Sequence, residues 1–175
     1  MLNWMLIICL LLLPTTGGRS SACQESPQTA KAPPNEWKGL VPLRSTRADV
    51  ERLLGKPAMS PGSFDIYKTE GERVDVRYSA GPCEASPVER WNVAKGIVIS
   101  MEVIPQKAIS IESLHLDTKR YLRIQESHPE NWVRYWNRDD GVMVHSILQG
   151  KTEYLYFIEY RPSAKDKSLR CSNDK

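Results

Sequence analysis

The spacing of hydrophobic residues is typical of a helix in residues 45–57 and typical of β-strands from residue 64 onward. In residues 45–57, STRADVERLLGKP, the apolar side chains Val50, Leu53 and Leu54 fall at i, i+3 and i+4. This spacing puts them on one stripe of a helix, and the charged residues Arg47, Glu51 and Arg52 are expected to lie in water. A helix of two turns is not stable alone, so the stripe is expected to pack on another element.

The ends of this helix are marked by their own signals. Thr46 and Asp49 stand three apart, so that the threonine hydroxyl accepts from the Asp49 amide while the carboxylate reaches back to the cap. Gly55 suits the residue that ends a helix, and Pro57 prevents its continuation. The sequence therefore predicts a capped two-turn helix.

Three segments with strand-like alternation follow the helix, at residues 64–68, 72–79 and 96–104. In the second of them, valines alternate with charged residues, and Gly71 suits a hairpin turn before it. Such a pattern favours an α+β fold in which a short helix packs on an antiparallel β-meander. We assign this first unit to residues 37–105.

The second half repeats part of this pattern. Residues 113–125 fit a helix or a strand, and residues 131–160 contain three alternating runs. Two turn pairs separate these runs, Asp140-Gly141 and Gln149-Gly150. The pattern predicts a second meander unit over residues 106–162, and hence two such units in tandem.

The first unit resembles the small bacterial outer-membrane lipoproteins of the BamE (SmpA/OmlA) type over residues 39–104. The matching residues are Gly39, Thr46, Asp49, Val50, Leu54, Gly55 and Pro57. The resemblance implies a helix followed by three antiparallel strands, in a protein of the cell envelope. The tandem arrangement is also similar to the secreted β-lactamase inhibitor proteins, which implies a binding role.

An apolar run near the start of the chain indicates export. Residues 4–13 are apolar and too short to span a bilayer, which suits the core of a signal peptide covering residues 1–22. Small residues precede Cys23, so three interpretations stay open: cleavage of an ordinary secreted protein, lipidation of Cys23 as in a lipoprotein, or an uncleaved anchor. We expect an exported protein in the periplasm, at the outer membrane or at the cell surface.

Residues 23–36 are rich in proline and polar residues and lack large apolar side chains, which predicts a disordered tether. The formal net charge of +3 falls to +2 once the leader with Arg19 is removed. A charge so near neutrality argues against nucleic-acid binding. A membrane is then expected to be contacted only through a lipid on Cys23.

Two cysteines remain in the folded part, Cys83 and Cys171. In an exported chain they form a natural disulfide pair, which would staple the polar tail at residues 163–175. The alternative is a reactive Cys83, with a site built around its loop and His145, in a small secreted enzyme. No catalytic, metal-binding or cofactor motif is present, so we expect no cofactor and no metal.

Aromatic side chains are dense in the second half. Period two places Trp132, Arg134 and Trp136 on one face of a strand. It likewise groups Tyr154, Tyr156, Ile158 and Tyr160 on one face of the last strand. These aromatics either fill the core or form an exposed surface that binds a protein or stacks on sugars.

Our first hypothesis is a non-enzymatic, exported module that binds a protein partner in the cell envelope. Its candidate surface consists of four aromatic residues and one arginine: Trp132, Arg134, Trp136, Tyr154 and Tyr156. Two alternatives stay open. One is a secreted enzyme inhibitor or a sugar or ligand binder that uses the aromatic sheet, and the other is the small enzyme with a site near Cys83.

Overall fold

The computed structural model describes residues 34–172, except residues 63, 85–89, 118 and 128. The expected signal peptide, Cys23 and most of the tether lie outside the described residues. The folded part begins before Trp37, because Asn35 is only 2% exposed and its amide donates to the carbonyl of Arg161 at 2.8 Å. The last residues expected to be tether therefore belong to the fold.

One α-helix, seven strands and two 3₁₀ helices make up the described part of the chain. Their bounds are α1 (Arg47–Leu54), β1 (Phe64–Lys68), β2 (Glu72–Tyr78), β3 (Val98–Pro105), η1 (Glu112–Leu114), β4 (Leu122–Gln125), β5 (Trp132–Asn137), β6 (Val142–Gln149), β7 (Thr152–Tyr160) and η2 (Ala164–Leu169). The fold is α+β and mostly β, as expected. No helix in the described residues has the length and apolar character needed to cross a membrane.

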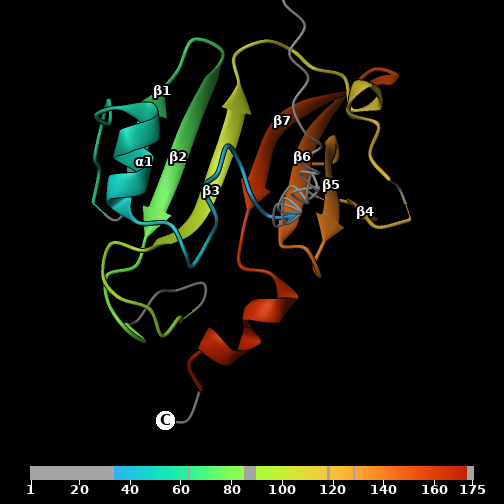
Figure 1. Ribbon diagram of the computed structural model, residues 1–175. Helices are drawn as coiled ribbons and strands as arrows, with labels where there is room; N and C mark the ends of the chain where they lie inside the picture. Colours follow the sequence, from blue (N-terminus) through green and yellow to red (C-terminus); the bar gives the residue numbers. More distant parts are fainter. Residues whose placement is uncertain (1–33, 63, 85–89, 118, 128, 173–175) are drawn as a thin grey trace, which may run out of the picture. The chain divides into compact units, whose positions relative to one another are not determined.

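All seven strands form one antiparallel sheet in the order β1-β2-β3-β7-β6-β5-β4 (Figure 1). The two meanders join where β3 pairs with β7, with Met101 opposite Tyr160 and Val103 opposite Ile158. The two predicted meanders thus share a continuous ladder of hydrogen bonds. The hairpin turns expected at Gly71, Gly141 and Gly150 are present.

Helix α1 has the predicted capping box, since the Asp49 amide donates to the Thr46 hydroxyl and the Asp49 carboxylate accepts from the Thr46 amide at 2.8 Å. The helix ends at Gly55, which has a positive φ of 78°. The expected apolar stripe is partly wrong: Val50 is fully buried, but Leu53 is 45% exposed. At about 100° per residue, Leu53 and Leu54 lie on opposite sides of Val50 around the helix axis, and the helix turns Leu54 toward the core and Leu53 toward solvent.

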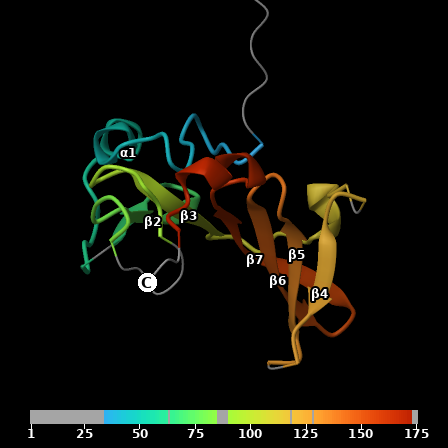
Figure 2. The ribbon, with the colours of Figure 1, turned by 90° about the horizontal axis from the view of Figure 1, so that it is seen from below.

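Two clusters of buried side chains lie on the same face of the sheet. The first contains Val50 of α1 together with Val74 and Val76 of β2, and Figure 2 shows α1 on one side of β2 and β3. The second contains Val133 and Val144 and is covered by the segment that includes η1. Because Val103 of the first cluster lies opposite Ile158 beside the second, both cores use one face.

The second half differs from the first in what covers its strands. The segment at residues 113–125 holds the end of η1 and the short strand β4, so the helical alternative is wrong for most of it. The polar tail is also more ordered than its composition indicates. It forms η2, which begins with a capping box between Ser163 and Asp166, and Asp166 is 2% exposed.

Candidate functional site

The sheet face opposite the two cores carries the predicted aromatic residues. On β5, Trp132 lies opposite Ile147, Arg134 opposite His145 and Trp136 opposite Met143. Side chains alternate along a strand, so Trp132, Arg134 and Trp136 share this face, as expected. Their neighbours Val133 and Tyr135 point into the second core.

A β-bulge changes which side chains of β7 join them. The pairing between β6 and β7 jumps from His145 opposite Phe157 to Ser146 opposite Leu155, which leaves Tyr156 without a direct partner. The extra residue shifts the alternation. The expected grouping on β7 is therefore wrong in part: Ile158 packs on the second core and Tyr160 on the first.

Aromatic rings contact one another across β5, β6 and β7. Trp132 and Tyr156 meet edge to face with centroids 5.1 Å apart, and Tyr156 lies 5.4 Å from Phe157. Phe157 in turn stacks on the imidazole of His145 at 4.0 Å. Tyr154 lies opposite Ile147, in the same row as Trp132. The bulge thus brings Tyr156 to the face where Trp132 stands.

These rings are accessible to a partner. Tyr156 is 44% exposed, and Trp132, Trp136 and Tyr154 are partly exposed. Leu122 of β4 lies opposite Trp136 and is 63% exposed, an apolar neighbour that the sequence did not single out. We call these five residues the aromatic patch. Its exposure argues against the alternative that these side chains fill the core.

Arg134, a member of the candidate surface, is paired within the chain. Its guanidinium forms an ion pair with Glu126, which lies just beyond β4. The pair neutralises the charge beside Trp132 and Trp136. This pairing leaves the aromatic patch largely apolar.

A row of carboxylates crosses the same face on the neighbouring strands. Asp75, Glu102 and Glu159 lie opposite one another on β2, β3 and β7. Burial raises the pKa of Glu102, and the like charges of Glu159 and Asp75 raise it further. The Nε2 atom of His145 lies 3.6 Å from Glu159 Oε2, and Arg161 Nε lies 3.4 Å from its other oxygen. The charge of Arg161 thus offsets part of this acidic row.

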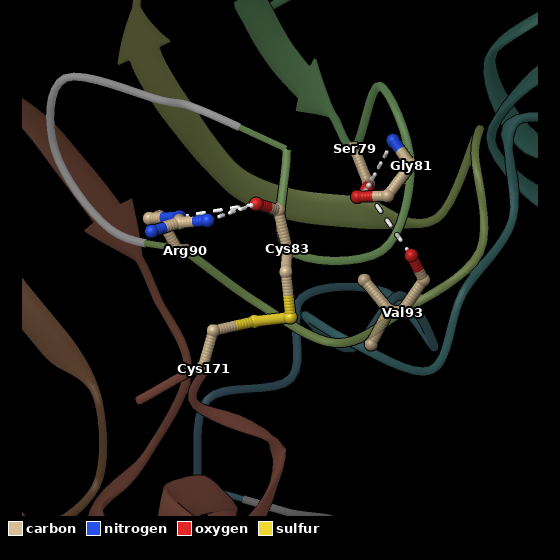
Figure 3. Close-up of a disulfide and its surroundings, with 6 residues drawn as sticks. All are labelled: Ser79, Gly81, Cys83, Arg90, Val93 and Cys171. Atoms are coloured by element: carbon tan, nitrogen blue, oxygen red, sulfur yellow. Dashed lines mark hydrogen bonds between the residues drawn. A yellow bond between two sulfur atoms is a disulfide. The ribbon is translucent and has the colours of Figure 1, made fainter. Parts of the chain in front are cut away.

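Cys83 and Cys171 form a disulfide, as predicted (Figure 3). Arg90 donates from Nε and Nη2 to the Cys83 carbonyl at 3.0 and 2.8 Å, and its own carbonyl accepts from the Cys171 amide. Trp91 and Arg170 pair as an isolated bridge next to the disulfide. The tail is therefore attached to the loop between β2 and β3 by the disulfide and by main-chain bonds.

The disulfide bears on the alternative of an enzyme near Cys83. A nucleophilic cysteine needs a free thiolate, and the Cys83 sulfur is bonded to Cys171. His145 lies within the aromatic face of β6, stacked on Phe157. In the described part of the chain, no group of three or more His, Cys, Asp or Glu side chains is placed to hold a metal ion.

Comparisons with known proteins add little to this geometry. No family model matches the chain, and no curated protein matches it. A solved structure of a DUF4309 family protein, YjgB of Bacillus subtilis, is similar with a TM-score of 0.47 and 12% sequence identity, over 72% of this chain and 84% of that one. At that level the likeness carries no functional inference. The resemblance to BamE stays a prediction.

Proposed function

We propose that this chain is an exported, non-enzymatic module that binds a protein partner through its aromatic patch. The observation that supports this function is the exposure of Tyr156 and Leu122, at 44% and 63%, on a sheet face rich in tryptophan. Large apolar side chains left in water lose the free energy that burial would supply. A protein partner that covers these side chains would gain that free energy on binding.

The residue types favour a protein over a sugar as the partner. Tryptophan and tyrosine supply much of the binding energy at protein interfaces, because they bury a large area with few rotatable bonds. A sugar would need an open ring face, whereas Trp132 is engaged by the ring of Tyr156. The aliphatic Leu122 offers no surface on which a sugar ring stacks.

Photo-cross-linking in the source cells tests this proposal. A photoreactive residue replaces Leu122, and W132A/Y156A is introduced in the same protein. We expect a discrete cross-linked partner that disappears in W132A/Y156A. The matched control is L53A/M59A, which removes two apolar side chains that are 45% and 58% exposed and lie in or near α1.

The outcomes separate clearly. A cross-link that survives W132A/Y156A, or that is lost equally in L53A/M59A, would refute the aromatic patch as the docking surface. Circular dichroism and thermal unfolding of each variant verify that the fold is retained. The same purified material tests export by intact mass: a chain that begins at Cys23 is expected, with or without a lipid increment.

A further inference from the structure

A separate feature lies at the end of the sheet near the disulfide. The turn between β5 and β6, the segment after β7 and η2 enclose a hollow of about 230 Å³. Its side chains include Trp91, Trp136, Arg138, Arg161, Lys167 and Arg170. We call it the cationic hollow. None of its described lining residues carries a carboxylate.

The cations around this hollow differ in how far their charge is offset. Arg161 lies 3.4 Å from Glu159, so part of its charge is compensated. Arg138 and Lys167 have no carboxylate within ion-pair distance among the described residues, and Arg138 lies over the ring of Trp136 at 5.7 Å. Two cations of the hollow are thus available to an anion.

Nearby carboxylates are held by cations outside the hollow. Asp166, although part of η2, accepts from Arg44 at 3.0 Å. Asp140, in the turn before β6, pairs with Arg120. These pairings leave the lining of the hollow with an excess of positive charge, which favours the binding of an anion.

The backbone fixes the walls of the hollow. The Arg161 amide donates to the Gly141 carbonyl at 2.7 Å, and the Ala164 amide donates to the Asp139 carbonyl at 3.2 Å. Trp91 and Arg170 are paired beside the disulfide. The backbone segments that carry the cations are therefore held together by hydrogen bonds and by the disulfide.

From this arrangement we propose that the cationic hollow binds a small oxyanion, a carboxylate or phosphate group carried on a compact body. Guanidinium groups bind such anions through charge-assisted, often bidentate hydrogen bonds. A hollow of about 230 Å³ is below the size of most drug-sized ligand sites, so it suits a small acid or a headgroup. The hollow shares Trp136 with the aromatic patch, but the proposal depends on the cations of the hollow and not on the protein partner proposed above.

Titration of the full folded chain tests this inference at constant ionic strength. The probes are inorganic phosphate, D-glucuronate and phosphatidylglycerol vesicles. D-glucose is the uncharged control for glucuronate, and phosphatidylcholine vesicles, which have no net charge, are the control for phosphatidylglycerol vesicles. Binding is followed by intrinsic tryptophan fluorescence and calorimetry. R138Q/K167Q removes two cations of the hollow, and K107Q/K151Q removes two exposed lysines elsewhere, with the same change in net charge.

We expect saturable binding of phosphate or glucuronate, absent for glucose, that weakens about tenfold or more in R138Q/K167Q and stays unchanged in K107Q/K151Q. Binding to phosphatidylglycerol vesicles alone, with the same response to the variants, would assign the oxyanion to a lipid headgroup and also support the site. If no probe binds, or if both double variants bind equally, the inference is wrong. Loss of the protein cross-link at Leu122 would leave this result unaffected.

Discussion

Arg44 and Asp166 join the two ends of the folded chain. The Nη2 atom of Arg44, just before α1, lies 3.0 Å from Oδ1 of Asp166, whose side chain is only 2% exposed. The other Asp166 oxygen accepts from the amide and the hydroxyl of Ser163, both at 2.8 Å. This carboxylate therefore caps η2 and holds it against the segment that leads into α1.

Replacing this carboxylate should loosen the C-terminal end. We expect D166A to lower the free energy of unfolding by about 1–3 kcal/mol, because the partly buried amide and hydroxyl of Ser163 and the guanidinium of Arg44 lose their acceptor. Urea denaturation measures the change. The control is D139A, which alters an exposed aspartate in the turn between β5 and β6. It should change the free energy of unfolding by less than about 0.5 kcal/mol. Equal effects of the two variants would contradict this role of Asp166.

The disulfide should stabilise the chain mainly through the unfolded state. Cys83 and Cys171 are 88 residues apart, and the chain-entropy model gives about 4–5 kcal/mol for closing such a loop. We expect C83S/C171S to shift the denaturation midpoint down by a corresponding amount. Adding dithiothreitol to the natural protein should lower the midpoint by the same amount. An unchanged midpoint under reduction would show that the disulfide does not stabilise the fold.

Gly141 and Gly150 provide a matched pair of turn glycines. Both have a positive φ, 70° at Gly141 and 65° at Gly150. A Cβ atom added to Gly141 would overlap the carbonyl oxygen of Arg161 and lie 2.9 Å from the carbonyl oxygen of Pro162. A Cβ atom added to Gly150 would have no heavy atom within 4 Å. G150A should cost about 1–2 kcal/mol from backbone strain. G141A should cost about 1–3 kcal/mol more from overpacking. Thermal unfolding compares them, and similar losses would show that the close approach at Gly141 is not rigid.

Asp49 should give the N-terminal helix a defined pH dependence. Hydrogen bonds from the backbone and then the side chain of Thr46, followed by one from Arg52, lower the pKa of Asp49 from 3.8 to about 2. A carboxylate with a depressed pKa in the folded state stabilises the protein above pH 4, and that contribution disappears as the pH falls to about 2.

The comparison variant is D49N. We expect it to be less stable than the natural protein at neutral pH and equally stable near pH 2, as measured by urea denaturation over a pH series. A stability difference that stays constant over the series would show that the charge of Asp49 does not contribute.

Much of the fold was determined by local sequence. The capping box of Thr46 and Asp49, the stop at Gly55 and the alternation of β2 depend on residues within a few positions of one another. These features are local, so the sequence predicts them without knowledge of the partners. The pairing of Cys83 with Cys171 followed from there being two cysteines in the folded part.

Other features depend on contacts that only the tertiary structure supplies. Arg47 was expected to lie in water, but its Nη1 lies 2.5 Å from the buried carboxylate of Asp65 and its guanidinium lies over the ring of Tyr78. The bulge at Tyr156 turns Ile158 and Tyr160 to the core, against the expected period of two.

The cationic hollow belongs to the same class. Its side chains come from a loop between β2 and β3, the turn after β5 and the tail, which are far apart in sequence and show no shared motif. Local patterns determined the elements and their exposed faces, because capping and alternation act over a few residues. The join of β3 to β7 and the gathering of cations were decided by long-range packing, which short-range patterns do not encode.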